Sequence, residues 1–218
     1  MNAPQALLER IGESQGPDQG FKRLVLLLTQ LGDFDSMEYA QALVPALPRL
    51  EQAGIRPLAI AIGDQAGAER FCSFTGLPRE LLEVEPDSKL HQDLGLSAGL
   101  QAPGGPWPSL LLMCAGIGSP GTLAEVLRGY TGDRSAAQRF DADETVSTGV
   151  LPPIPAALFR RAGGDGFQRP FELATVRLRN MNEVLRNWST YVPNDRFMTQ
   201  RGGTFPVSYT HLTLPTTD

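Results

Sequence analysis

Two cysteines and two histidines carry the strongest nucleophilic and metal-binding chemistry in this 218-residue chain. Cys72 and Cys114 are too few for a disulfide scaffold, and they lack the paired spacing of a zinc site. Because His91 and His211 are the only histidines, a histidine-rich metal centre is excluded. The remaining candidates for a functional site are single thiols, carboxylates and glycine-rich turns.

Cys72 lies in the middle of a predicted helix, residues 64–76. That helix places Ala68, Phe71 and Thr75 on the same face as the thiol. Burial in an apolar face raises the pKa of a thiol and keeps it protonated. We therefore interpret Cys72 as a structural residue, with a redox-active thiol as the less favoured alternative.

Cys114 belongs to the apolar run LLLMCAG, residues 110–116. A glycine-rich turn follows, and Ser119 with Pro120 predicts the start of a helix. Such a turn could present the thiol to a ligand, which makes Cys114 the second candidate for a reactive thiol. The sequence does not place Cys114 within disulfide distance of Cys72.

The same turn contains the pattern G-x-G-x-x-G, formed by Gly116, Gly118 and Gly121. This pattern binds dinucleotides when it opens the helix of the first strand-helix-strand unit. Here it lies far beyond the first strand and has Pro120 inside it. A packing turn is the better interpretation, nucleotide binding at 116–122 is the weaker one, and we expect no cofactor.

The stretch LVLLLTQLGDFDSME, residues 24–38, predicts a buried strand, a tight turn and a helix in succession. Its continuous apolar run suits a strand that is covered on both faces, as in a parallel sheet. Gly32 permits the turn, and Asp35 with Glu38 has the spacing of a capping box. A helix should therefore begin within one or two residues of Ser36.

Three carboxylates follow the predicted strand: Asp33, Asp35 and Glu38. Together they could supply oxygen ligands to a divalent cation. Capping of the helix explains Asp33 and Asp35 without any metal. We therefore expect no metal site in this turn.

Strands and helices alternate as far as residue 96, which predicts an α/β domain. A helix over 37–53 should break near Leu43, because Pro45 and Pro48 each remove a backbone donor. The further predicted elements are a strand at 56–63, the helix at 64–76, a strand at 80–87 and a short helix at 88–96.

Residues 97–170 interrupt this alternation, and we interpret them as a helical and irregular insertion. Within it we expect a loop at 97–109, an apolar run at 110–118 and mostly irregular structure at 139–166. A long amphipathic helix follows. Its apolar positions on one face are Phe171, Ala174, Leu178, Met181, Leu185 and Trp188.

Four arginines accompany the long helix: Arg169, Arg177, Arg179 and Arg186. They could form a patch that binds an anion. Arginines in such positions more often form a solvated or ion-paired face, which is the interpretation we favour.

The composition is that of an ordinary globular protein, with 41% hydrophobic and 20% charged residues. A net charge of −5 and the absence of lysine or arginine runs argue against nucleic acid and against an anionic membrane surface. No stretch approaches the ~20 apolar residues of a membrane span. We expect a cytoplasmic protein whose residues 1–20 form a flexible tail.

The stretch VSYTHLTLPT, residues 207–216, resembles the in-frame translation of a transposon-end sequencing adapter. We therefore interpret residues 206–218 as a non-native tail. On this interpretation the strand that begins at 201–205 is cut, the fold is incomplete at its C-terminal end, and one sheet edge is left unprotected.

Five segments together resemble the peroxiredoxin-like proteins of the AhpC/TSA superfamily: QLGDFDSMEYA, ERFCSFTGLP, LLLMCAGIGSPGTLAEVLRGYTGDRSA, GFQRPFELATVRLRNMNEVLRNWSTYVP and TQRGGTF. The resemblance covers nearly all of residues 21–205. It implies one thioredoxin-like α/β sandwich over those residues, with the insertion at about 97–170. It also implies a thiol-based redox ancestry and an antioxidant, peroxide-related role.

Redox-active members of this superfamily carry Cys-x-x-Cys directly after the first strand, where a helix N-terminus lowers the thiol pKa. The matching positions here are Asp33 and Ser36, so the resemblance implies a degenerate active-site turn, whose residues are Gly32, Asp33, Phe34, Asp35 and Ser36. An aspartate cannot attack a peroxide, and a serine without a base is inert.

The resulting prediction is a peroxiredoxin-like protein without the usual peroxidatic cysteine, acting as a binding or regulatory module. The alternative is a thiol-dependent antioxidant peroxidase or reductase that uses Cys114 or Cys72. We expect a small molecule or a protein as partner, and the sequence leaves a homodimer open.

Overall fold

The computed structural model describes residues 7, 10–11, 22–114, 117, 124, 139–141, 143–149, 152–162 and 169–208. The chain divides into two compact units. Unit 1 consists of residues 1–99 and 190–218, and unit 2 consists of residues 100–189. Among the described helices, none is both long and apolar enough to cross a membrane.

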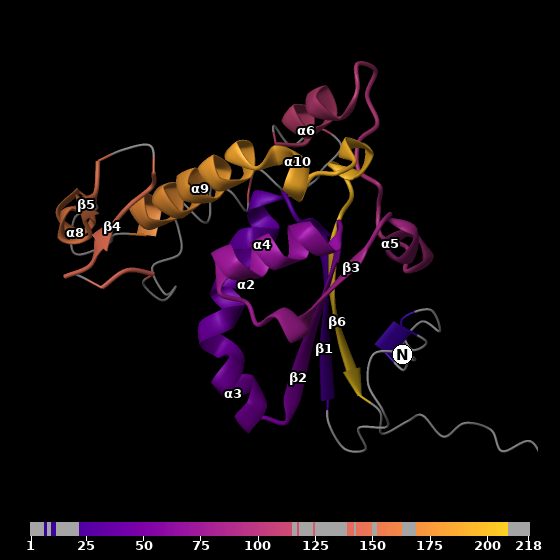
Figure 1. Ribbon diagram of the computed structural model, residues 1–218, viewed down its shortest axis with the longest axis horizontal. Helices are drawn as coiled ribbons and strands as arrows, with labels where there is room; N and C mark the ends of the chain where they lie inside the picture. The colour runs from indigo at the N-terminus through magenta and orange to yellow at the C-terminus, as the bar shows by residue number, and fades with distance from the viewer. Residues whose placement is uncertain are drawn as a thin grey trace, which may run out of the picture. The chain divides into compact units, whose positions relative to one another are not determined.

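Unit 1 is built on a four-stranded sheet with the strand order β3-β2-β1-β6 (Figure 1). Its strands are β1 (Lys22–Gln30), β2 (Ile55–Ile62), β3 (Leu82–Glu85) and β6 (Gly203–Ser208). The first three run parallel, and β6 runs antiparallel to β1. A mostly parallel central sheet with helices is the predicted thioredoxin-like α/β fold class, which is confirmed.

The register of β1 and β2 aligns their apolar side chains on each face of the sheet. Val25 pairs with Leu58 and Leu27 pairs with Ile60, so these four side chains face the same way. They form one core cluster whose other buried members are Leu7, Ile11 and Val207. Half-buried leucines in and after α5 (Lys89–Asp93) pack against this cluster.

The helix after β1 is divided as the prolines predict. It consists of α2 (Phe34–Leu43), a 3₁₀ turn η1 (Val44–Ala46) and α3 (Leu47–Gln52). The next helix, α4 (Gln65–Thr75), ends at Gly76, which adopts the left-handed conformation with φ 79°. Glycine takes that conformation without steric strain, so it ends the helix sharply and lets the chain turn towards β3.

The last described strand, β6, lies at the sheet edge beside β1. A 3₁₀ turn η3 (Asp195–Phe197) precedes it, and another, η2 (Arg79–Leu81), precedes β3. Val207, which the adapter interpretation assigns to a non-native tail, pairs with Arg23 and is buried. The origin of residues 206–218 and the domain limits remain predictions, and residues 209–218 lie outside the described part.

Unit 2 contains more regular structure than expected. Helix α6 (Pro106–Cys114) begins inside the predicted loop, because Pro106 and Pro108 are tolerated in a first helical turn. The stretch expected to be mostly irregular, 139–166, is irregular over much of its described part but also holds short regular elements. That stretch contains β4 (Thr145–Val146), β5 (Ile154–Pro155) and α8 (Ala157–Ala162).

The long helix α9 (Arg169–Arg186) is followed by the short helix α10 (Trp188–Tyr191). Its predicted apolar positions do share one face, but that face is the outer one. Phe171 and Met181 are each 38% exposed, and Leu185 is 54% exposed. The buried side of the helix is formed instead by Leu173, Val176, Asn180 and Val184.

Candidate functional site

The turn between β1 and α2 is closed by its own aspartate. The Asp33 carboxylate accepts a 2.9 Å hydrogen bond from the backbone nitrogen of Ser36 and thereby caps α2. The predicted capping box of Asp35 and Glu38 was therefore wrong. The helix begins at Phe34, two residues earlier than that box requires and still within two residues of Ser36.

The hydroxyl of Ser36 has no remaining hydrogen-bonding capacity. It donates to the Asp33 carboxylate over 2.8 Å, so the hydroxyl of Thr29, 3.0 Å away, must donate to it. The backbone nitrogen of Thr29 also donates to Ser36 Oγ over 3.2 Å. With both lone pairs engaged and only 5% of the residue exposed, Ser36 is held as part of the cap.

This arrangement determines which charge lies at the start of α2. The N-terminus of a helix favours an anion, which is how it stabilises a thiolate in thiol enzymes. Here the Asp33 carboxylate supplies that anion. A carboxylate is neither a peroxide nucleophile nor a redox group, so Asp33 itself supplies no thiol chemistry at this helix start.

Sequence reasoning missed Gln30, the last residue of β1. Gln30 is 2% exposed, and its side-chain nitrogen donates to the backbone oxygen of Asn194. Its side-chain oxygen has no hydrogen-bond partner in the structure. The signal for this position was a polar pair, Thr29 and Gln30, at the end of an otherwise apolar strand, since buried polar groups need dedicated partners.

Cys72 lies on the inner side of α4 and is 7% exposed. Burial raises the pKa of the Cys72 thiol to about 11, and the nearby carboxylates of Glu69 and Glu80 act in the same direction. The charge of Arg79 lowers that pKa but does not offset burial. At neutral pH the Cys72 thiol is therefore protonated and a poor nucleophile.

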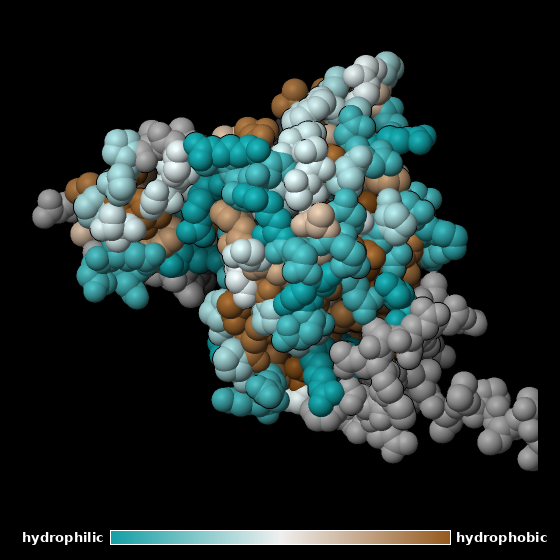
Figure 2. Space-filling model, in the orientation of Figure 1, coloured by the Kyte–Doolittle hydropathy of each residue, from teal (hydrophilic) through white to brown (hydrophobic). Residues whose placement is uncertain are grey.

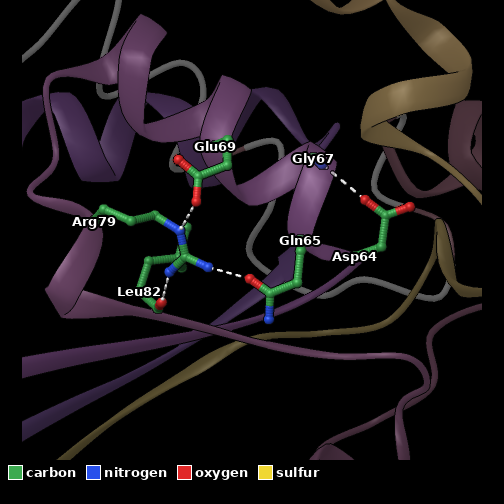
Figure 3. A network of polar contacts seen from close by, with 6 residues as sticks. All are labelled: Asp64, Gln65, Gly67, Glu69, Arg79 and Leu82. Carbon is green, nitrogen blue, oxygen red and sulfur yellow. Dashed lines mark hydrogen bonds and ion pairs between the residues drawn. The ribbon is translucent and has the colours of Figure 1, made fainter.

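Arg79 is the centre of a polar network that joins α4 to β3 (Figure 3). Its Nε donates to the Glu69 carboxylate over 3.0 Å, and its other nitrogens donate to the side chain of Gln65 and the backbone oxygen of Leu82. At the start of the same helix, Asp64 caps the backbone nitrogen of Gly67 over 2.7 Å. These contacts hold α4 against the start of β3, and they include Arg79 and Glu69, two of the charged groups that act on the Cys72 thiol.

Cys114 is the last residue of α6. Cys72 belongs to unit 1 and Cys114 to unit 2. Cys72 is a free thiol.

His91 is fully buried in unit 1. Its Nε2 lies 2.7 Å from the backbone oxygen of Leu28 and must donate to it, because a carbonyl oxygen only accepts. The opposite nitrogen, Nδ1, has no hydrogen-bond partner in the structure. Burial lowers the pKa of His91, whereas the bond to Leu28 and the charge of Glu85 act in the other direction.

Within the described part of the chain, the other candidate residues form no further site. Gly116, Gly118 and Gly121 lie outside the described residues. Within the described part of the chain, no group of three histidine, cysteine or acidic side chains is placed to hold a metal ion. In the arginine group, Arg186 donates to the backbone oxygen of Gly149 over 3.4 Å.

A family model described as AhpC/TSA antioxidant enzyme matches residues 42–211. The match begins within α2 and covers β2, β3 and β6, together with Cys72, Cys114 and His91. The turn that contains Asp33 and Ser36 lies before it. No curated protein and no solved structure matches the chain.

Proposed function

Because the chain belongs to the AhpC/TSA antioxidant enzyme family, we propose that it is a peroxiredoxin-like binding or regulatory module without the family's usual thiol peroxidase chemistry. The observation that supports this proposal is the Asp33–Ser36 cap at the start of α2. A peroxidatic thiol at a helix start is stabilised by the same backbone nitrogen groups that here bind a carboxylate.

The carboxylate also gives the proposed module a property that a thiol lacks. A thiolate loses its charge when it is oxidised to a disulfide, whereas Asp33 keeps its charge under oxidising and reducing conditions. A small molecule or protein partner that binds beside this turn would therefore be bound equally well in both conditions.

The test is a peroxide-consumption assay with a thiol reductant, comparing the native chain with Asp33→Cys and with the double variant Asp33→Cys/Ser36→Cys. We expect no turnover by the native chain. In Asp33→Cys we expect a thiol pKa below the ordinary ~8.5, measured by thiolate ultraviolet absorbance, because the helix start stabilises the thiolate. An ordinary or raised pKa in that variant would contradict the role given to the helix start.

The alternative function is a thiol-dependent peroxidase or reductase that uses Cys114 or Cys72. Cys114 is the stronger candidate of the two, because burial and the raised pKa of about 11 keep Cys72 protonated. The variants Cys114→Ser and Cys72→Ser distinguish the two functions. Native turnover that one of these substitutions abolishes would overturn our proposal in favour of the alternative.

A further inference from the structure

One face of the sheet in unit 1 is covered in part by residues that precede the first strand. Leu7, Arg10 and Ile11 are helical, and we call these three residues the N-terminal clip. Leu7 and Ile11 are one helical turn apart and therefore point the same way. Both are buried in the core cluster that contains Val25 and Leu58.

The third residue of the clip reaches an acidic strand at the edge of the same face. Arg10 forms two ion pairs with β3, from Nη2 to Glu83 and from Nε to Glu85, each over 2.9 Å. In the register of β2 and β3, Glu83 pairs with Ile60 and Glu85 pairs with Ile62. Both carboxylates therefore project from the face that carries the apolar cluster.

Other side chains cover the rest of this apolar face. Leu90, Leu94 and Leu96, in and after α5, are half-buried against the same cluster. In Figure 2 brown, hydrophobic side chains are visible in this region among teal ones. The clip is thus one of two covers over a face that is apolar in the middle and acidic along β3.

The attachment of the clip is weak compared with that of the strands. Residues 12–20, which separate it from β1, contain three glycines, one proline and no large apolar side chain, the composition of a linker. The side chains of Arg10, Glu83 and Glu85 are 30%, 23% and 25% exposed, so water and salt screen their charges. The entropy lost in ordering the segment is of the same order as the gain from burying two aliphatic side chains.

We propose that the N-terminal clip is releasable: it closes over the acidic-edged apolar face of the sheet while Arg10 is paired, and it opens locally when those ion pairs are screened or lost. The open face fits a helical segment of the same chemistry as the clip, with aliphatic side chains four residues apart and a cation between them. This device is independent of the proposed function, because neither Asp33 nor a cysteine takes part in it.

The first test measures how fast a thiol beneath the clip reacts with a maleimide in the absence of denaturant. In a chain that carries Cys72→Ala and Cys114→Ala, Val25→Cys places a thiol under the clip. Ala59→Cys places one on the opposite face of the same sheet, and both positions are buried. We expect Val25→Cys to react at least about tenfold faster, because local opening does not require unfolding. Equal rates would overturn the proposal.

The second test removes the ion pairs. Arg10→Gln should accelerate the labelling of Val25→Cys by roughly 5- to 30-fold, the effect of losing two part-exposed ion pairs, and should leave Ala59→Cys unchanged. Arg79→Gln is the matched control, because the Arg79 side chain is 32% exposed and forms a 3.0 Å ion pair with Glu69 elsewhere in unit 1. No acceleration by Arg10→Gln, or equal acceleration by both substitutions, would overturn the proposal.

The third test asks whether the face recognises the clip itself. A synthetic peptide of residues 1–15, added at about 1 mM to match the effective concentration of a tethered segment, should slow the labelling of Val25→Cys in the Arg10→Gln chain. The same peptide with Arg10→Glu should not slow it, because it lacks the cation that pairs with β3. Absence of protection by the first peptide, or equal protection by both, would contradict the proposed chemistry of the face.

The last measurement needs no substitution and so does not depend on the folding of any variant. In hydrogen exchange of the native chain, the amides of residues 7–11 should exchange faster than those of β1, and faster still when the salt concentration is raised to about 1 M. Equal protection of the two segments would show that the clip opens only when the whole unit unfolds, and this would overturn the proposal.

Discussion

The carboxylate of Asp33 and the hydroxyl of Ser36 are joined by a 2.8 Å hydrogen bond, and the same carboxylate oxygen accepts a 2.9 Å bond from the backbone nitrogen of Ser36. One side chain thus satisfies a backbone donor at the start of α2 and orients the buried hydroxyl that reaches back to Thr29 in β1. The strand and the helix are held together through this pair.

Replacing Asp33 should therefore reduce the stability of unit 1. Asp33→Ala removes an N-cap and leaves a buried hydroxyl without its acceptor, so we expect the free energy of unfolding to fall by about 1–2 kcal/mol. Asp35→Ala is the control, because Asp35 is exposed in the same turn and should cost less than about 1 kcal/mol. Urea unfolding followed by circular dichroism measures both, and equal losses would contradict the assignment of Asp33 as the cap.

The thiol of Cys72 should make the protein less stable at high pH. Its pKa is raised from 9.0 to about 11 in the folded chain, so the unfolded chain releases this proton first as the pH rises. The stabilising contribution is complete below pH 9 and is lost as the pH rises towards 11, by roughly 2–3 kcal/mol.

The measurement compares the free energy of unfolding of the native chain and of Cys72→Ala at several pH values between 8 and 11. Tyrosines and lysines titrate in the same range, but they are common to both proteins. As the pH rises, the native chain should therefore lose more of its free energy of unfolding than Cys72→Ala does. A constant difference would show that the thiol ionises equally in the folded and unfolded chains.

His91 should make the protein sensitive to acid. Burial lowers its pKa below the ordinary value of 6.5, so the unfolded chain binds a proton that the folded chain resists. The stabilising contribution is present above pH 6.5 and is lost as the pH falls through the folded pKa. His91→Gln keeps a donor for Leu28 but does not titrate, and it should lose less stability than the native chain between pH 7 and pH 5. Equal losses of stability in the native chain and in His91→Gln would show that groups other than His91 cause the acid sensitivity.

Two glycines in unit 1 allow the stability cost of backbone strain to be measured apart from the cost of steric overlap. Gly95 and Gly99 have similar positive φ values of 74° and 76°. A Cβ at Gly95 would meet nothing within 4 Å, whereas one at Gly99 would lie 2.1 Å from the backbone oxygen of Thr199. Gly95→Ala should lower the free energy of unfolding by about 1–2 kcal/mol, because alanine is strained in the left-handed conformation. Gly99→Ala should cost about 1–3 kcal/mol more, since the backbone must also shift.

Thermal unfolding of the two glycine variants measures this difference directly. The Gly99 contact joins residue 99 to the loop before β6, where Thr199 Oγ1 also donates to the backbone oxygen of Ala98 over 2.8 Å. Equal losses of stability in Gly95→Ala and Gly99→Ala would show that this loop moves aside at no cost.

The parts of the fold that depend on local physics were predictable from the sequence. The apolar run of β1, the break caused by Pro45 and Pro48, and the caps Asp64 and Gly76 depend on residues within one or two turns of each other. The choice between Asp33 and Asp35 as the cap of α2 was not predictable. Both are good N-cap residues, and the contact of Ser36 with Thr29 in β1 favours the earlier start.

The orientation of α9 was not predictable for a similar reason. Apolar residues lie on both sides of this helix, and the periodicity of the sequence identifies the more regular side. Tertiary contacts decide which side is buried: Val176 packs in the cluster of Phe140, Val146 and Phe159, and Glu172 accepts hydrogen bonds from the backbone of residues 139 and 140. The apolar periodicity of a single helix contains no information about such tertiary contacts.

The pairing of β1 with β6 has a consequence for how the chain folds. Leu27 of β1 pairs with Gly203 of β6, so the central strand contacts a segment from near the other end of the sequence. Closing a loop of that length is entropically costly and makes this pairing a late, slow step. During synthesis β1 and β2 emerge long before β6, and the edge of β1 stays unpaired until β6 arrives. The nascent chain should therefore depend on chaperones to protect that edge from other strands.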